Sequence, residues 1–177
     1  MNTTTWIIFI ILTLANIWLT WWVSLRQKRF HGIYRFISFE CIFLLVLMNY
    51  PVWFSNPFAW HQIISWILLI GSTLIAVFGF YLLYHLGKPS DQLEDTTQVI
   101  SSGLFRYIRH PLYMSLILGG FAVMMKQLQW PQIIMSLVNL LVLWLTARVE
   151  EGEMIRKFGQ EYVDYMKKTK MFIPYLL

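Results

Sequence analysis

Long stretches without a charged residue constrain this chain more than any other feature of its sequence. The first covers residues 6–23, which are 18 residues without Asp, Glu, Lys or Arg. A helix of this length rises about 1.5 Å per residue and crosses most of the hydrocarbon layer of a bilayer. Similar stretches cover residues 36–54, where Glu40 is the one charged residue, and residues 63–86. They predict membrane-spanning helices and exclude an ordinary water-soluble domain.

The composition agrees with a membrane protein. Hydrophobic residues make up 58% of the chain and charged residues 13%, against roughly 25% charged residues in an average soluble domain. This balance excludes a disordered chain and argues against a nucleic acid as partner, although the formal net charge is +5. In membrane proteins, Lys and Arg gather on the cytoplasmic side, where they face anionic headgroups. Cys41 is the single cysteine, so no internal disulfide forms.

The second half of the chain continues with a polar loop and two more apolar segments. The loop covers residues 87–107 and carries Ser, Thr, Gln and acidic side chains. Residues 112–125 are apolar over 14 residues, and they complete a span if the helix begins near His110 or the membrane thins beside it. After a turn that contains Pro131, residues 133–147 form the last apolar segment. The short connection predicts that the fourth and fifth helices form a hairpin.

The basic residues predict the direction in which five spans cross the membrane. With the N-terminus outside, thirteen of the fourteen Lys and Arg residues fall in cytoplasmic segments, and Lys126 alone lies outside. The positive-inside rule describes this asymmetry for an N-out, C-in protein. The same orientation brings every candidate reactive group to the cytoplasmic face. Because the first apolar run begins at Trp6 without a basic region before it, we expect a retained span and no cleaved signal peptide.

Residues 150–170 have the pattern of an amphipathic helix. Ile155, Phe158 and Tyr162 recur at steps of three and four residues, and Tyr165 or Met166 continues the stripe. This pattern predicts a helix that packs on the membrane surface or over the hairpin and that does not span. The expected fold is therefore all-α: a polytopic membrane protein of about five transmembrane helices with a C-terminal amphipathic helix.

The segment Gly103-Leu-Phe-Arg-Tyr-Ile-Arg-His-Pro-Leu-Tyr113 holds the first candidate functional residues. Pro111 suits the first turn of a helix, so the fourth helix is expected to begin there. Arg109 and His110 lie about one turn before Tyr113, and the three side chains can converge on one site. A helix start also offers amide groups and a partial positive charge to an anion. The alternative is that Arg and Tyr only anchor the helix at the membrane interface.

Two adjacent carboxylates supply the second group of candidates. They belong to Arg148-Val-Glu-Glu151, at the end of the fifth apolar segment. Neighbouring side chains point in different directions on a helix, so either Glu150 or Glu151 can turn inward while the other meets water. An inward carboxylate would attract an ammonium or sulfonium group. The alternative is an acidic pair that only makes the tail soluble.

Two further features have plainer interpretations. The loop of residues 86–94, which includes Lys88, could fold over a polar ligand, but a simple connection between two helices is favoured. Glu40 lies within an apolar run, where charged groups are candidates for function. Because Arg35 is close in the sequence, a salt bridge near the cytoplasmic boundary is favoured over a catalytic role. The sequence has no Walker loop, GxGxxG, HExxH or GxSxG motif, and no metal site is expected.

Taken together, these segments resemble the isoprenylcysteine carboxyl methyltransferase family of membrane enzymes. The first matching block is Val99-Ile-Ser-Ser-Gly-Leu-Phe-Arg-Tyr-Ile-Arg-His-Pro-Leu-Tyr113, where the family has an apolar pair, Gly, an aromatic residue and Arg-His-Pro-x-Tyr. The second block is Ala147-Arg-x-Glu-Glu151, followed by Phe158-Gly-Gln-Glu-Tyr162, Tyr165 and Ile173-Pro174. The resemblance covers about the C-terminal half, from Leu86 onward. The first two spans match only as hydrophobic helices.

The resemblance implies a cofactor and a set of residues that hold it. Members of the family bind S-adenosylmethionine in a cytoplasmic pocket formed by the last spans and the C-terminal helix. It thus implies one domain over residues 1–177, with three spans in 1–86 and a cofactor-binding half in 87–177. The implied cofactor-binding residues are Thr97, Gln98, Val99, Ile100, Phe105, His110, Pro111, Leu112, Tyr113, Glu150 and Glu151. Among them Glu150 matches the family's cofactor-binding carboxylate, and Phe105 stands where the family often has Tyr.

Two arginines are the candidate catalytic residues. Arg109 belongs to the first block, and Arg148 is the basic residue nearest to the position where related eukaryotic enzymes hold a substrate-contacting Arg. The resemblance implies methyl transfer from S-adenosylmethionine to a small lipophilic or membrane-embedded acceptor, with carboxyl O-methylation of an isoprenylcysteine-like substrate as the precedent. The loop Gly87-Lys88-Pro89 departs from the family's better-known loop, which puts a prenylcysteine substrate in question.

Other functions remain open on the same scaffold. One is N-methylation of a phospholipid amine, and another is a non-catalytic membrane protein that binds or assembles partners. Sterol reductases have a related architecture with a nicotinamide cofactor, but the acidic pair and the short loop favour the sulfonium cofactor. The expected partners are the lipid bilayer and the lipophilic acceptor. The expected location is a membrane, the inner membrane in a prokaryote, with the active site facing the cytoplasm.

Overall fold

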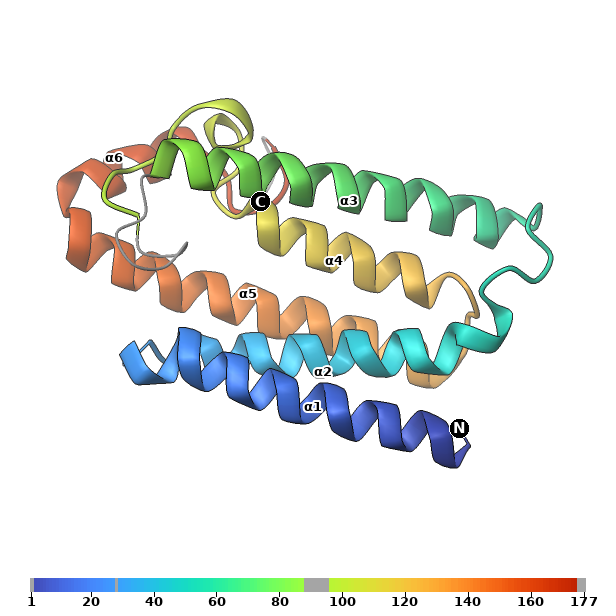
Figure 1. Cartoon of the computed structure of the whole chain (residues 1–177). Coiled ribbons are helices and arrows are strands. Elements are labelled where there is room, and N and C mark those ends of the chain that lie inside the picture. Colours follow the sequence, from blue (N-terminus) through green and yellow to red (C-terminus); the bar gives the residue numbers. More distant parts are fainter. Residues whose placement is uncertain (1, 28, 88–95, 175–177) are drawn as a thin grey trace. The chain divides into compact units, whose positions relative to one another are not determined.

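The structure is a computed structural model that describes residues 2–27, 29–87 and 96–174. Within these ranges it is all-helical, which confirms the predicted fold class (Figure 1). The α-helices are α1 (Thr3–Val23), α2 (His31–Asn49), α3 (Trp60–Gly87), α4 (Pro111–Met124), α5 (Trp130–Phe158) and α6 (Gln160–Lys168). Short 3-10 turns lie at Leu25–Gln27, Tyr50–Val52 and Gly103–Arg106.

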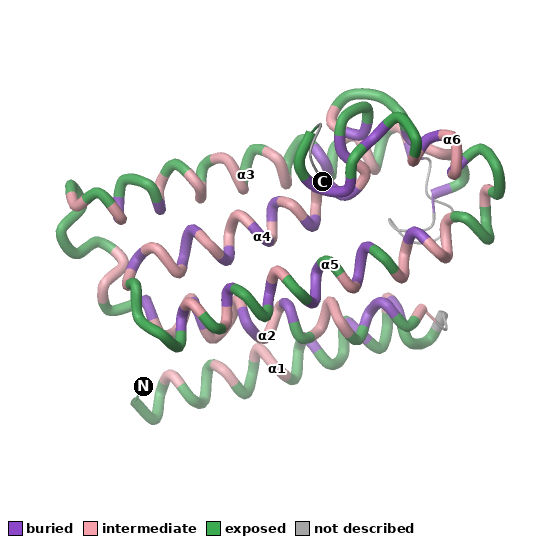
Figure 2. Tube along the Cα trace, turned by 180° about the vertical axis from the view of Figure 1, so that it is seen from behind, coloured by how far each residue is buried: buried purple, intermediate pink, exposed green. Residues whose placement is uncertain are grey.

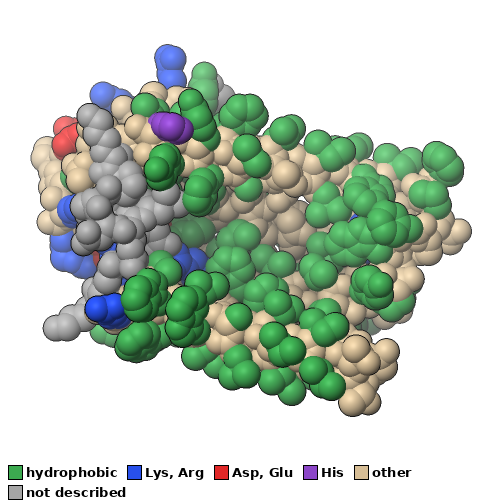
Figure 3. All heavy atoms as spheres, viewed as in Figure 1, with side chains coloured by type: hydrophobic (Ala, Val, Ile, Leu, Met, Phe, Trp, Pro, Cys, Tyr) green, Lys and Arg blue, Asp and Glu red, His purple; other side chains and the backbone are tan. Residues whose placement is uncertain are grey.

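Four of the helices are long and apolar enough to cross a membrane, namely α1, α3, α5 and α2 with the turn that follows it. The shorter apolar helix α4 has 14 residues, the length expected for the fourth segment. These helices indicate an integral membrane protein. Figure 3 shows hydrophobic side chains exposed along α1 and α3, where a soluble protein would carry polar ones.

The described residues divide into two compact units. The first consists of Met1–Gly71 and Ile117–Thr146, and the second of Ser72–Leu116 and Ala147–Leu177. The helices α3, α4 and α5 therefore each contribute residues to both units.

In the first unit, a carboxylate joins α1 to α2. Oε2 of Glu40 accepts a hydrogen bond of 2.7 Å from the hydroxyl of Thr13, and Oε1 accepts one of 2.8 Å from the amide of Asn16. Most other side chains of α1 are exposed, as Figure 2 shows, and are suited to contact with lipid. The guanidinium of Arg35 donates to the hydroxyl of Ser24 at 2.7 Å. The expected neighbour of Glu40 in a salt bridge was Arg35, but the carboxylate is instead bound by polar groups of α1.

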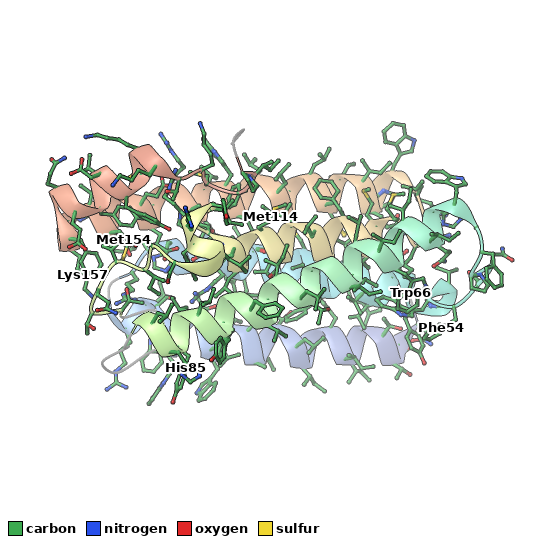
Figure 4. The ribbon with its side chains drawn as sticks, turned by 90° about the horizontal axis from the view of Figure 1, so that it is seen from above. Phe54, Trp66, His85, Met114, Met154 and Lys157 are labelled. Atoms are coloured by element: carbon green, nitrogen blue, oxygen red, sulfur yellow. The ribbon has the colours of Figure 1, made fainter. Side chains whose placement is uncertain are left out.

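Buried polar side chains also hold the remainder of the first unit. Ser38 of α2 donates to the side-chain oxygen of Asn139 on α5 at 2.6 Å, and a side chain at Gly120 of α4 would collide with the Asn139 amide. Lys126 is 2% exposed; its ammonium donates to Gln62 at 3.0 Å and lies 3.7 Å from the ring centroid of Trp66. Phe54 stacks on the same ring (Figure 4). Small residues and hydrogen bonds of this kind hold helices together where lipid removes the hydrophobic driving force.

In the second unit, the end of α3 packs closely on the start of α4. Ser72 donates to the carbonyl of Ser115 at 2.8 Å, and a Cβ atom at Gly79 would lie 3.2 Å from the side chain of Leu112. Gly103 has a φ of +59° and leaves room for the side chain of Leu82. A Cβ atom at Gly103 would collide with Leu82, so the turn that precedes α4 requires glycine at this position.

The tail differs from its prediction in where the helix begins. A separate helix was expected over residues 150–170, but α5 continues without interruption through Glu150 to Phe158. The break falls at Gly159, whose φ of 59° and ψ of −131° suit glycine alone, and α6 begins at the next residue. Nothing between the apolar segment and the acidic pair stops a helix, so the acidic pair belongs to the spanning helix and not to the tail.

Candidate active site

The site is built in the second unit around the residues that precede α4. The backbone there pairs with a segment that follows α6, through an isolated parallel bridge between Ile108 and Lys170. The amide of Arg109 donates to the carbonyl of Lys170 at 2.8 Å, and the amide of His110 donates to the carbonyl of Met171 at 3.2 Å. We expected amides at this helix start to be available to an anion, but the last two before Pro111 are used by the chain itself.

The imidazole of His110 lies against both members of the acidic pair. Its Nδ1 is 3.7 Å from Oε2 of Glu150, and its Nε2 is 3.5 Å from Oε1 of Glu151. His110 precedes α4 and the carboxylates lie on α5, so the contact follows from the antiparallel hairpin. The ring of Tyr113, one turn along α4, is parallel to the imidazole at 5.4 Å between centroids, and the ring of Phe172 lies 6.2 Å away.

Two buried polar atoms at this contact have no hydrogen-bond partner among the described residues. They are Nε2 of His110 and Oε2 of Glu150. The contact of His110 with Glu150 is too long for a hydrogen bond at 3.7 Å, and its contact with Glu151 at 3.5 Å is poorly aligned for one. Buried polar groups are nearly always paired in folded proteins, and each exception requires an explanation, of which a bound ligand or water is one. His110 and Glu150 are therefore equipped to bind a polar molecule.

Glu151 is the inward carboxylate of the pair, and Arg109 is its main partner. Nε of Arg109 donates to Oε1 of Glu151 at 2.6 Å, and the two side chains are 10% and 4% exposed. Nη1 of the same guanidinium donates to the carbonyl of Met166 at 3.3 Å and to the carbonyl of Thr169. Arg109 thus contacts α5, α6 and the segment after α6, while the ring stacked on Tyr113 is that of His110.

Two tyrosines of α6, Tyr162 and Tyr165, are buried in the same unit. The hydroxyl of Tyr165 donates to the carbonyl of Phe105 at 2.7 Å. Burial raises the pKa of Tyr165, and burial followed by the negative charges of Glu150 and Glu151 raises the pKa of Tyr162. Both phenols are therefore neutral at physiological pH and can donate hydrogen bonds.

The other implied cofactor-binding residues occupy two places. Thr97 and Gln98 lie beside the end of α3, where the amide of Thr97 donates to the carbonyl of Gly87 at 3.0 Å and the amide of the Gln98 side chain donates to the carbonyl of Leu86. Their neighbours Val99 and Ile100 are half-buried and buried. Pro111 is buried and Leu112 half-buried at the start of α4.

The remaining candidates are Arg148, Glu40 and Lys88. Arg148 is exposed on α5. Glu40 belongs to the first unit, where its carboxylate bonds to α1. Lys88 and the loop of residues 88–95 lie outside the described residues. In the ranges that the structure covers, no group of three or more His, Cys, Asp or Glu side chains is arranged so that it could hold a metal ion.

Sequence reasoning missed the segment of residues 169–172 as part of the site. It carries Thr169, Met171 and Phe172, all buried, and has neither helical periodicity nor a charged motif. Tyr162 and Tyr165 were assigned to an apolar stripe and to the second matching block, but no binding role was predicted for them. The signal available for them was their polar hydroxyl, since buried tyrosines usually bond through it.

Comparisons with known proteins agree with a membrane methyltransferase. The model of a family described as phospholipid methyltransferase (PEMT) matches residues 60–161, which is more than half of the chain. Methanethiol S-methyltransferase of Pseudomonas deceptionensis is 24% identical over 112 residues, 60% of this chain and 42% of that protein. Methanethiol S-methyltransferase 1 of Bradyrhizobium diazoefficiens is 27% identical over 117 residues, 63% of this chain and 39% of that protein.

The isoprenylcysteine enzymes are also similar, over a shorter segment. Protein-S-isoprenylcysteine O-methyltransferase of Mus musculus is 30% identical over 87 residues, 47% of this chain and 30% of that protein. The chain thus spans less than half the length of each of these three relatives.

Proposed function

Because the chain belongs to the phospholipid methyltransferase family, we propose that it transfers a methyl group from S-adenosylmethionine to a small lipophilic or membrane-embedded acceptor. The observation that carries this proposal is the contact of His110 with Glu150 and Glu151, where two buried polar atoms have no hydrogen-bond partner among the described residues. They belong to the motif blocks that resemble methyltransferases.

The residues present fit S-adenosylmethionine by their chemistry. The cofactor carries an ammonium, a carboxylate and a sulfonium, so both hydrogen-bond acceptors and donors are needed to hold it. Oε2 of Glu150 can accept from an ammonium, and Nε2 of His110 can donate or accept according to its tautomer. The neutral hydroxyl of Tyr162 adds a further donor beside the carboxylates. Bound there, the cofactor supplies an electrophilic methyl group whose leaving thioether is neutral.

The chain's own residues then have to hold and align the reactants. His110 and Glu150 bind the polar partner, and the aromatic rings of Tyr113 and Phe172 cover the imidazole. Tyr162 and Tyr165 of α6 are buried and keep this part of the second unit largely apolar. Alignment and exclusion of water are the main requirements of a direct displacement in which no strong acid or base is needed to expel the leaving group.

The acceptor class is the open part of the proposal. The family's description names phospholipids, and the relatives are named for methanethiol and for protein-S-isoprenylcysteine. A phospholipid amine, a small thiol and a lipid-linked carboxylate are all lipophilic or reach the site from the bilayer. A non-catalytic membrane protein on the same scaffold is the alternative from a different class.

Cofactor binding separates an enzyme from a non-catalytic scaffold. We expect the whole chain, purified in detergent, to bind S-adenosylhomocysteine in a calorimetric titration and to gain thermal stability from it. If millimolar ligand produces no heat of binding and no thermal stabilisation, the methyltransferase function is excluded.

A labelled methyl group identifies the acceptor. Membranes containing the chain are incubated with methyl-labelled S-adenosylmethionine, once alone and once with methanethiol, and the volatile and lipid fractions are analysed separately. Label in a phospholipid supports N-methylation, label in a volatile thioether supports S-methylation, and label in a base-labile lipid ester supports carboxyl O-methylation. Membranes that lack the chain are the control for background methylation, and the label should fall in membranes with the Glu150→Ala variant.

A further inference from the structure

We infer that Arg109 is a positioning residue that ties the segment of residues 166–172 to Glu151 and thereby holds the imidazole of His110 in place. The nature of the ligand in this inference rests on the proposed function, but the tie itself does not. Arg109 was a candidate catalytic residue by its place in the motif. The structure assigns its guanidinium a different task.

The guanidinium spends its donors on the protein. Nε donates to the carboxylate of Glu151 at 2.6 Å, and Nη1 donates to the carbonyls of Met166 and Thr169. These acceptors lie on α5, on α6 and just after α6. A planar fork of donors can serve three acceptors in fixed directions, whereas the single ammonium of a lysine cannot reproduce that geometry. One side chain therefore joins three parts of the second unit.

The backbone of the same residues reinforces this tie. The amide of Arg109 donates to the carbonyl of Lys170, the amide of His110 donates to that of Met171, and the amide of Lys170 donates to the carbonyl of Tyr107. Arg109 is thus fixed through both its main chain and its side chain. Because His110 follows directly in the sequence, displacement of the 166–172 segment would displace the imidazole as well.

The segment that Arg109 holds contributes one side of the site. Phe172 is buried and its ring lies 6.2 Å from the imidazole of His110. Tyr165, one turn before Thr169, bonds to the carbonyl of Phe105. Without the guanidinium, the carbonyls of Met166 and Thr169 would lose a buried donor, and the carboxylate of Glu151 would lose its closest positive partner. We therefore expect the segment to open and the ligand to bind less tightly.

The test uses the whole chain in detergent and two measurements. Calorimetry gives the affinity for S-adenosylhomocysteine, and hydrogen exchange gives the protection of the amides in residues 107–110 and 169–172. The variants are Arg109→Gln, Arg109→Lys, Glu151→Gln and the double variant Arg109→Gln with Glu151→Gln. Lys167→Gln is the matched control, because Lys167 is an exposed cation of α6 that pairs with Asp164 at 2.8 Å.

We expect Arg109→Gln to weaken binding about tenfold, which corresponds to about 1.4 kcal/mol, and to speed exchange in both segments. The double variant should bind the ligand no more weakly than whichever single variant has the lower affinity. If Arg109 acts through Glu151, removing Arg109 has no further effect once Glu151 is replaced. Arg109→Lys should stay close to Arg109→Gln in exchange, since a lysine keeps the charge and loses the fork. Lys167→Gln should match the unmodified chain in both measurements.

Three results would overturn the inference: unchanged exchange in Arg109→Gln, additive losses in the double variant, or full recovery of affinity and protection in Arg109→Lys. If the unmodified chain binds no S-adenosylhomocysteine, the proposed function fails, and the exchange measurement still decides whether Arg109 ties the two segments.

Discussion

At the scale of single residues, His110 stands at the start of the hairpin's sequence and Glu150 near its end, and the two side chains approach to 3.7 Å. Each carries a buried polar atom that a ligand can satisfy. We predict that His110→Ala and Glu150→Ala each weaken binding of S-adenosylhomocysteine by at least about 1 kcal/mol, the cost of leaving a buried polar partner unpaired. Calorimetric titration of the two variants against the unmodified chain measures this.

Asp164→Ala is the control for both substitutions. Asp164 lies on α6, and its carboxylate pairs with Lys167 and Gln160 on the surface. Exposed pairs contribute little, so this variant should bind the ligand like the unmodified chain. A loss equal to that of the other two variants would mean that the site is misplaced, and the role of an interfacial anchor would then be preferred for the segment from Arg109 to Tyr113.

The residues of the site were predictable to different degrees. The approach of His110 to the acidic pair follows from Pro111 starting one helix and from a short turn leading into the next. Which of two adjacent carboxylates faces inward depends on the rotation of α5, and the sequence left that choice open. The partners of Arg109 were not predictable, since two of them are backbone carbonyls that any residue type could supply.

At the scale of secondary structure, Gly159 separates α5 from α6 with a backbone conformation that other residues adopt only under strain. We predict that Gly159→Ala destabilises the docking of α6 by about 1–3 kcal/mol, the cost of such a conformation for a residue with a side chain. Hydrogen exchange over residues 160–172 should become faster as a result.

Gly71→Ala provides the matched control for this change. Gly71 lies within α3, and a Cβ atom built there has no neighbour within 4 Å. Alanine favours a helix more than glycine does, so this variant should be as stable as the unmodified chain or slightly more so. If residues 160–172 exchange equally fast in Gly159→Ala and Gly71→Ala, the break between α5 and α6 does not depend on glycine at position 159.

The pairing of α1 with α2 depends on Glu40, which accepts hydrogen bonds from Thr13 and Asn16. We predict that Glu40→Leu lowers the free energy of unfolding in detergent by about 1–2 kcal/mol, the sum expected for two interhelical hydrogen bonds in a membrane. Titration with a denaturing detergent, followed by tryptophan fluorescence, measures it. Glu40→Gln keeps the hydrogen-bonding capacity and should lose less; equal stability of Glu40→Leu and the unmodified chain would contradict this role.

The helices were more predictable than the connections between them. Apolar runs gave α1, α2 and α3 to within a few residues, because the bilayer demands a minimum length of uncharged helix. The continuation of α5 past Ala147 was not predicted. The change from apolar to polar residues marks the end of the apolar segment but not the end of the helix, because helix-forming residues continue through the acidic pair. Residues 169–172 carry no periodic pattern, and their pairing with residues 107–110 depends on tertiary contacts.

At the scale of the whole molecule, the distribution of basic residues predicts that the loops after α2 and after α4 face outward. In a background in which Cys41 is replaced by Ala, we expect Phe58→Cys and Leu128→Cys to react with a membrane-impermeant thiol reagent in intact cells. Both side chains are exposed. Arg106→Cys and Lys167→Cys should react only after the membrane is opened, because positively charged segments stay in the cytoplasm.

Labelling of Arg106→Cys in intact cells would contradict the orientation, and labelling of Arg106→Cys and Leu128→Cys from the same side would show that α4 does not cross the membrane. The 14 residues of α4 make this second comparison the more demanding one.

The separation of the site's partners along the chain sets the order in which the site is made. The Tyr165 hydroxyl bonds to a carbonyl 60 residues earlier, and Arg109 bonds to a carboxylate 42 residues later. At a synthesis rate of roughly 5–20 residues per second, roughly 3–12 s separate Phe105 from Tyr165 at the ribosome. During that interval Arg109 and His110 are synthesised well before their acidic partners, which follow about 40 residues later. A nascent chain halted before Glu150 therefore contains the complete sequences of α1 to α4 and lacks both carboxylates and the tyrosines of α6.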